Sequence, residues 1–372
     1  MQKPLCSLVE DRSLVICSGA GGVGKTTTSA AIGLAAALGG RRAVVLTVDP
    51  ARRLANALGL SHLPNEPVPI QGPLLEGAAP GGSLHALMLD PKQTFDALVR
   101  RLHAPEEAER LFQNRLYQNV SGMIAGMQEY TAGEKLHELA HDPRFDLVVL
   151  DTPPTRNALD FLQAPTTLSR FLDERVLRWF LPGPRPRNPL LRRTGKLVGG
   201  ALGKIFGEGF AEEMGEFLAT LGELTAVVRR HAEEVRALLA SPSARFLLVT
   251  SPLDEALDEA LYFHDRLREL GFPFGGYVIN RVHRERPPLE PREVTGTRAA
   301  LAEILGEERA SSAMDRLEGW YGRERERALA DRRALRRLRG LGEVPTVGVP
   351  LLEEAADEGI LRRMVETAFE FR

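Results

Sequence analysis

Cysteine is almost absent from this chain, since only Cys6 and Cys17 occur among its 372 residues. Two cysteines cannot form the disulfide framework that stabilises small secreted proteins, and these two are not spaced as a Cys-x-x-Cys pair. Zinc sites built from paired cysteines are excluded for the same reason. This usage of cysteine favours a protein of a reducing compartment, and we expect a cytoplasmic location.

Long uncharged apolar segments are also missing. No such run approaches the roughly 20 residues that a transmembrane helix needs, and the first four residues are not followed by the apolar segment typical of a signal peptide. The formal net charge is only −2, so no excess of basic residues points to nucleic acid as a partner. We expect any contact with a membrane to be peripheral, at its inner face, or through a partner.

A glycine-rich segment is the strongest signal present. Residues 19–26 match the pattern G-x-x-x-x-G-K-[ST], between a buried strand predicted at 14–18 and an alanine-rich helix predicted at 27–38. In this setting backbone N–H groups and a helix N-terminus surround a phosphate. Lys25 would reach the β- and γ-phosphates of a nucleotide, and the Thr26 hydroxyl would ligate Mg²⁺. The predicted nucleotide-binding residues of this loop are Gly19, Gly21, Gly22, Val23, Gly24, Lys25, Thr26 and Thr27.

Apolar runs rich in Val, Leu and Ile recur along the chain, at 14–18, 43–49, 84–89, 145–151, 245–250, 276–280 and 344–350. Most lack polar alternation, which is typical of parallel strands buried on both faces, and helical stretches separate them. The predicted fold class is therefore α/β, with a doubly wound, mostly parallel sheet of the P-loop NTPase type. Ligands of such sheets bind at the carboxyl ends of strands, where the sequence places Gly19, Asp49, Asp151, Ser251, Asn280 and Pro350.

Two carboxylates stand at these strand ends. Asp151 ends the run 145–151, which is typical of a Walker B strand, and would hold Mg²⁺ through a water; the alternative is an aspartate that caps the next turn. Asp49 follows the second strand and can orient a water that attacks the γ-phosphate. Residues 151–157 lie where a loop would sense that phosphate, and the alternative there is a rigid proline turn.

Residues 163–243 interrupt the alternation of strands and helices, because they are too long for a simple crossover. Their second half has apolar residues at alternating spacings of four and three, typical of one face of a long helix. We predict a helical insert at 163–243 between two parts of an ATPase core, 1–162 and 244–372. Its apolar face would bind a client or partner, or be buried within the insert itself, and includes Phe210, Met214, Phe217, Leu221, Leu224 and Val228.

Two other segments are predicted to lie at the surface. Residues 64–83 are rich in proline and glycine, which favours a surface loop. Residues 323–339 mix acidic residues with many arginines, which favours a solvated helix face, with contact to anionic lipid or nucleic acid as the minority interpretation.

Together these residues resemble the ArsA-like ATPases, which include arsenite-pump ATPases and ATPases that target tail-anchored membrane proteins, within the MinD/ParA class of nucleotide-dependent dimers. The resemblance covers nearly the whole chain and is strongest to a bacterial branch of paired subunits. It implies ATP, Mg²⁺, and a homodimer or heterodimer with a related subunit, with a hydrophobic client or membrane-protein partner. It also implies catalytic roles for Lys25 and Asp49, and an adenine site at Asn280, Pro350 and Leu351. The switch residues that it implies are Asp49, Pro50, Arg52, Asp151, Thr152, Pro153, Thr155 and Arg156.

The sequence departs from this family at several positions. The family's loop, a deviant Walker A motif, usually carries a lysine where this chain has Ala20, and that lysine reaches the phosphates bound by the partner subunit. Cations of this kind accelerate phosphoryl transfer by about 10³–10⁵, so its loss predicts slow hydrolysis. Arg52, Arg53, Arg156 or a lysine of another subunit would replace it. Without paired cysteines, neither a zinc bridge nor a thiol site for arsenite is expected.

Three functions are compatible with these patterns. The first is a cytosolic ATP-driven dimeric switch whose helical inserts bind a client or partner protein. The second is the ATPase subunit of an anion or metalloid efflux system, although the missing thiols count against arsenite. The third is a regulatory subunit that binds ATP and scarcely hydrolyses it, which Ala20 favours. In none of the three do we expect nucleic acid or zinc to take part.

Overall fold

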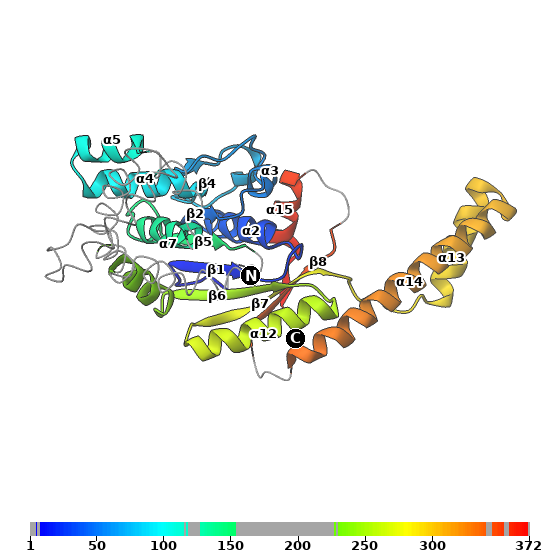
Figure 1. Cartoon of the computed structure of the whole chain (residues 1–372). Coiled ribbons are helices and arrows are strands. Elements are labelled where there is room, and N and C mark those ends of the chain that lie inside the picture. The colour runs from blue at the N-terminus through cyan, green and yellow to red at the C-terminus, as the bar shows by residue number, and fades with distance from the viewer. Residues whose placement is uncertain are drawn as a thin grey trace, which may run out of the picture.

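The predicted strands lie in one sheet in the computed structural model of the chain (Figure 1). The structure describes residues 8–114, 127–153, 230–339, 344–352 and 357–370, with Leu5, Tyr117 and Val227. Within these residues the strand order is β3-β4-β2-β5-β1-β6-β7-β8-β9, and only β3 and β9, at the edges, pair antiparallel. The strands are β1 (Leu14–Ser18), β2 (Arg42–Thr47), β3 (Val68–Pro69), β4 (Ser83–Met88), β5 (Leu147–Asp151), β6 (Ala244–Thr250), β7 (Phe274–Val282), β8 (Thr346–Pro350) and β9 (Phe369–Glu370).

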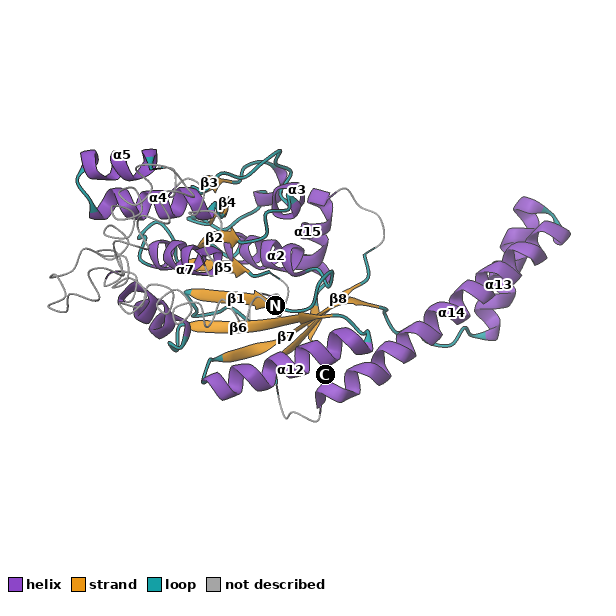
Figure 2. Ribbon diagram, in the orientation of Figure 1, coloured by secondary structure: helices purple, strands orange, loops and turns teal. Residues whose placement is uncertain are grey.

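Helices cover both faces of this sheet (Figure 2). On β1, Val15 and Cys17 belong to one buried cluster and Leu14 and Ile16 to the other, as expected when alternate side chains of a strand enter two cores. The first cluster includes residues of α2 (Lys25–Leu38), α3 (Arg53–Ala57) and α15 (Asp357–Thr367). The second includes residues of α7 (Met127–Ala140), α12 (Asp254–Leu270) and the end of α14 (Glu307–Arg339). The predicted doubly wound α/β fold is therefore confirmed.

The register of the central strands determines where the candidate site lies. Asp151, at the end of β5, is level with Cys17 of β1 and with Thr47 of β2. Because all three strands are parallel, their carboxyl ends meet at one edge, and the segments that follow them start side by side.

The smaller elements differ from the sequence prediction. Each predicted strand is present, but the two-residue strands β3 and β9 were not predicted, because such short edge strands have too few residues to show a period. The segment 64–83, predicted as a surface loop, contains β3 and the short 3₁₀ helix η1 (Pro73–Leu75). It also buries Ile70 and Leu74, which are 3% and 4% exposed. This surface-loop prediction was therefore wrong for the middle of the segment, which packs against α2.

Most of the predicted insert lies outside the described residues, including the whole set from Phe210 to Val228 that was predicted as a client surface. Residues 230–239 are described and helical. Within them Val235 is buried against Gly133 of α7, and the His231 Nδ1 atom lies 2.7 Å from a carboxylate oxygen of the buried Glu134. The C-terminal end of the apolar face thus packs on the core.

A helical hairpin extends away from the sheet and its flanking helices (Figure 1). It consists of α13 (Pro291–Leu305) and the 33-residue α14, and α14 is about 50 Å long at 1.5 Å per residue. The charged run 323–339 lies on α14 and is mostly exposed, as predicted. At its base, Arg337 forms ion pairs with Asp254 and Asp258 of α12.

The remaining helices lie beside α7 at the edge of the sheet. They are α4 (Pro91–Leu102), which contacts α7, and α5 (Pro105–Gln113), which contacts α4. No helix among the described residues is both long and apolar enough to cross a membrane.

Candidate nucleotide-binding site

The phosphate loop connects β1 to α2, and it needs glycine at two points of close approach. A Cβ atom at Gly19 would lie 2.0 Å from the carbonyl oxygen of Val249 on β6. One at Gly24 would lie 2.2 Å from Nδ2 of Asn280 on β7, and Gly24 also has a φ of +92°, in the left-handed region that favours glycine. The loop can therefore pack directly on β6 and β7.

Lys25, the first residue of α2, is almost completely buried beside this loop. Its ammonium group donates a hydrogen bond of 2.7 Å to the Ala20 carbonyl oxygen, so the side chain lies back along the loop. Burial lowers the pKa of Lys25, whereas the negative charges of Asp151 and Asp49 act to raise it. The ammonium group thus lies between the loop and both predicted carboxylates, where it can balance phosphate charge.

Asp151 is fully buried at the centre of a cluster of hydroxyl groups. The hydroxyl groups of Thr26 and Thr47 each donate a 2.8 Å hydrogen bond to its Oδ2 atom, and that of Ser29 lies 3.5 Å from Oδ1. Burial raises the pKa of the Asp151 carboxyl to about 6, although these hydrogen bonds oppose the effect. Such a network holds the carboxylate in a fixed position at the start of α2.

Mg²⁺ is the ion that these residues suit. Hydroxyl and carboxylate oxygens are the hard donors that Mg²⁺ prefers. Thr26 and Asp151 present such oxygens in direct contact, at the N-terminus of α2. The donor chemistry therefore fits the predicted metal role of both residues.

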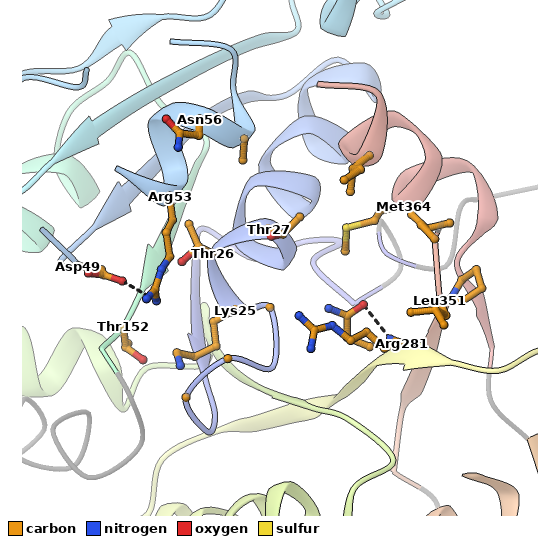
Figure 3. A pocket seen from close by; sticks show the side chains of 18 residues that line it. Lys25, Thr26, Thr27, Asp49, Arg53, Asn56, Thr152, Arg281, Leu351 and Met364 are labelled. Atoms are coloured by element: carbon orange, nitrogen blue, oxygen red, sulfur yellow. Dashed lines mark hydrogen bonds and ion pairs between the residues drawn. The ribbon is translucent and has the colours of Figure 1, made fainter. Parts of the chain in front are cut away.

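Asp49 lies two residues beyond β2, with each of its carboxylate oxygens engaged. The backbone N–H of Ala51 donates to Oδ1 at 2.9 Å, and Nη1 of Arg53 lies 3.1 Å from Oδ2. Figure 3 shows this ion pair beside Thr26 and Lys25. Asp49 is thus held at the wall of the cavity by its own turn.

Asn280 connects the phosphate loop to β7. Its side-chain N–H donates to the Val23 carbonyl oxygen at 3.0 Å, and its Oδ1 atom accepts a hydrogen bond from the backbone N–H of Arg281. Arg281 has a φ of +59°, where the β7–β8 register shifts. The amide has a second N–H and a second lone pair for a base edge. The geometry is therefore compatible with the predicted adenine contact, and adds a structural role for Asn280.

These residues surround one cavity of about 650 Å³, which is within the range of small-molecule sites. One end is polar and contains the phosphate loop with Lys25 and Asp49 (Figure 3). The other end is formed by apolar side chains from β8, the segment after it and α15, which are Pro350, Leu351, Leu352, Ile360 and Met364. This division suits a ligand with a charged group and an apolar ring.

Most of the predicted site residues line the cavity or contact residues that do. Gly21, Gly22, Gly24, Lys25, Thr26, Thr27, Asp49, Thr152, Asn280, Pro350 and Leu351 line it directly. Asp151 lies behind Thr26, and Gly19 lies against Val249. Arg52 caps α3, with its side chain exposed and outside the lining. Thr155 and Arg156 lie outside the described residues, which end at Pro153 in this part of the chain.

Sequence reasoning missed several residues of the site. Thr47 and Ser29 contact Asp151, and Asn56, Ile360 and Met364 line the cavity. No motif marks these positions. The strand alignment of Thr47 with Asp151 is the signal that could have identified Thr47, once the order of β2 and β5 was known.

The pair His137 and His141 on α7 is a second motif that the sequence prediction did not use. Its H-E-x-x-H spacing is typical of helical metal sites. In the structure the two rings contact each other, with centroids 4.2 Å apart, and Nε2 of His137 lies 3.2 Å from Glu234. In the described part of the chain, no group of three or more His, Cys, Asp or Glu residues is arranged to hold a metal ion. The pair therefore belongs to the contact between α7 and residues 230–239.

Comparison with known proteins finds several similar ATPases. The chain is 26% identical to ATPase GET3 of Malassezia globosa over 53% of this chain and 54% of that protein. It is 31% identical to Protein Rv2184c of Mycobacterium tuberculosis over 42% of this chain and 38% of that protein. It is 25% identical to ATPase ARSA2 of Chlamydomonas reinhardtii over 81% of this chain and 75% of that protein. The chain thus spans about half the length of GET3 and less of Rv2184c.

A family model gives the wider match. The model of the anion-transporting ATPases, ArsA_ATPase, matches residues 12–295. This range runs from the start of β1 through the phosphate loop, Asp49, Asp151 and Asn280, so it contains most of the site described above. The family predicted from the motifs is confirmed: this chain belongs to the ArsA family of anion-transporting ATPases.

Proposed function

We propose that this chain binds Mg-ATP in the cavity at the phosphate loop and hydrolyses it. The observation that supports this most strongly is the convergence of four side chains from separate segments at one edge of the sheet. Lys25 and Thr26 begin α2, Asp151 ends β5, and Asp49 follows β2. Parallel strands deliver these groups to one place, and phosphoryl transfer needs this combination of cation, metal ligands and water-orienting carboxylate.

Each group then has a defined task. The Lys25 ammonium would bind the β- and γ-phosphates, and Asp49 would orient the attacking water and accept its proton. Thr26, with Asp151 behind it through a water, would hold Mg²⁺, which when bound neutralises charge on the phosphates. Asn280, Pro350 and Leu351 would bind the adenine ring at the apolar end.

The test is hydrolysis and nucleotide binding by Asp49→Asn and Lys25→Ala. Asp49→Asn should keep Mg-ATP affinity within a few fold and lower single-turnover hydrolysis by about 10²–10⁴, because only water orientation is lost. Lys25→Ala should lose ATP affinity, since the charge on the phosphates is then uncompensated. Asp258→Asn, an exposed aspartate on α12, is the control and should match wild type. Equal hydrolysis by wild type and Asp49→Asn, at a measurable rate, would contradict the assignment of Asp49.

We further infer a dimeric switch, with a helical insert at 163–243 between core segments 1–162 and 244–372. ATP would close two protomers, identical or from a related paired subunit as in the bacterial branch, and rearrange the inserts so that Phe210, Met214, Phe217, Leu221, Leu224 and Val228 bind a client or partner. We expect this to take place in the cytoplasm, with any membrane contact at its inner face. Support comes from the family and from the chain's 25–31% identity to ATPases of that family.

A weakly hydrolysing regulatory subunit is the second candidate. It is supported by Ala20, an uncharged residue in the phosphate loop, and by the ion pair that engages Asp49. Equal and negligible single-turnover rates for wild type and Asp49→Asn, with intact ATP binding, would favour it. The efflux alternative rests on the family alone, and arsenite-stimulated turnover would support it. Cys17 argues against arsenite, because burial raises the pKa of its thiol to about 12.

A further inference from the structure

Asp49 is not free to act in the arrangement that the structure shows. Arg53 lies 3.1 Å from its Oδ2 atom, and the backbone of Ala51 donates to Oδ1. A carboxylate that orients water has to accept a hydrogen bond from that water in good geometry. The guanidinium group occupies the surroundings of Oδ2, so Asp49 is best placed to act once Arg53 has left it.

Arg53 is well placed to leave. It is the first residue of the short helix α3, and its side chain is 67% exposed whereas that of Asp49 is 22% exposed. Ion pairs between exposed side chains are weak, because water screens the charges and a long side chain loses freedom when it is held. The contact between Arg53 and Asp49 is therefore one that a stronger anion can replace.

The position of Arg53 in the cavity indicates which anion that is. Among the described residues that line the cavity, the cations are Lys25, Arg53 and Arg281. Lys25 lies along the phosphate loop, and Arg281 lies near Leu351 at the other end (Figure 3). Arg53 is on the Asp49 side, close enough that its charge contributes to lowering the pKa of Lys25. Ala20 adds no charge to the loop, so Arg53 is the available second cation there.

We propose that Arg53 exchanges Asp49 for the γ-phosphate when ATP binds. This assignment rests on the proposed function of the site. A guanidinium fork matches phosphate oxygens and can bind two at once, and the γ-phosphate carries more charge than a carboxylate. The exchange adds a second cation at the phosphate that is transferred, and it releases Asp49 to hold the attacking water. With ADP, which has no γ-phosphate, Arg53 stays paired with Asp49.

The experiment compares wild type, Arg53→Gln, Arg53→Lys and Arg363→Gln by calorimetric binding of Mg-ADP and Mg-ATPγS and by single-turnover hydrolysis of ATP. Arg53→Gln should weaken Mg-ATPγS binding by about tenfold or more and change Mg-ADP binding less than twofold. It should also slow hydrolysis by at least about 10². Arg53→Lys keeps the charge and should recover part of the ATPγS affinity. Arg363→Gln removes an exposed cation of α15 that does not line the cavity, and should leave all three measurements unchanged.

Several outcomes would overturn the proposal. If Arg53→Gln hydrolyses ATP faster than wild type, Arg53 only restrains Asp49 and does not bind the phosphate. If ADP and ATPγS weaken equally, or neither weakens, Arg53 does not recognise the γ-phosphate. A wild-type chain that binds neither nucleotide would overturn the proposed function and this assignment with it. A wild type that binds both, beside an unchanged Arg53→Gln, would remove only the role of Arg53.

Discussion

Gly24 is the residue at which backbone conformation and a neighbouring side chain together allow the least variation. Its φ is +92°, and any Cβ would lie 2.2 Å from Nδ2 of Asn280. We predict that Gly24→Ala loses most of its ATP affinity and unfolds at a lower temperature. The reason is that either the loop moves or Asn280 gives up its hydrogen bond to Val23. Nucleotide titration and thermal unfolding measure the two effects.

Gly21→Ala is the matched control for the stability of the loop. Nothing lies within 4 Å of a Cβ at Gly21, and its φ is outside the left-handed region. Its thermal unfolding should therefore match wild type. Equal melting temperatures for Gly24→Ala and Gly21→Ala would show that the contact with Asn280 does not restrict the loop.

Asp146, which precedes β5, predicts a pH dependence of stability. Hydrogen bonds from the Arg42 side chain and backbone lower the pKa of Asp146 from 3.8 to about 2. A carboxyl with a lowered pKa in the folded state stabilises that state above its unfolded pKa, and this contribution is lost as the pH falls through its folded pKa. The stabilisation by Asp146 should therefore be complete near pH 5 and disappear as the pH falls from about 4 to 2.

Urea unfolding of wild type and Asp146→Asn between pH 5 and pH 2 tests this. The pair is exposed, at 46% for Arg42 and 39% for Asp146, so solvent screening limits the difference to about 1 kcal/mol or less at pH 5. The difference should shrink toward zero at pH 2. A difference that stays constant over this range would mean that another property of the substitution is responsible.

Among the elements, the hairpin of α13 and α14 is the most independent of the site. The Tyr321 hydroxyl donates to the Pro287 carbonyl oxygen at 2.6 Å, so these two residues lie side by side across the hairpin. Replacing residues 288–320 by a short Gly-Ser linker should therefore close without strain. We predict that this variant melts within about 3 °C of wild type, less than 1 kcal/mol, because in the removed part only Ala310 and Met314 are buried. Its affinity for Mg-ATP should be unchanged.

The base of the same hairpin should behave differently. Leu335 and Leu338 of α14 are 1% and 6% exposed and belong to the core that contains α12. Leu335→Ala should cost about 2–5 kcal/mol in unfolding free energy. If the shortened hairpin melts as early as Leu335→Ala, the distal part contributes to the core in a way that its burial does not indicate.

The whole molecule brings its nucleotide site to the edge where β5, β1 and β6 end, beneath a loop that leads toward residues 154–229. A site in that position can couple nucleotide to a second protomer. We predict that Asp49→Asn, which traps ATP, forms a homodimer in Mg-ATP and is a monomer in ADP, as measured by light scattering. A monomer that binds ATP would point to a related partner subunit, and a dimer in both nucleotides would contradict an ATP-gated association.

The sequence by itself determined the elements and the chemistry of the phosphate loop. Apolar runs without alternation can only be buried on both faces, and a loop from Gly19 to Thr26 between a strand and a helix has one common use. Those local patterns were enough to predict each parallel strand, Lys25, Thr26 and the family. Asp49 and Asp151 followed because each stands at or just beyond the end of such a run.

Only the tertiary structure decided which neighbours those residues have. Strand order, which no local pattern fixes, places β2 and β1 on either side of β5, and so Thr47 and Thr26 meet Asp151. It also decided among the arginines, since the turn of α3 directs Arg53 to Asp49 and into the cavity while Arg52 is outside the lining. Contacts between residues far apart in sequence depend on packing of whole elements, and the sequence patterns used here are local.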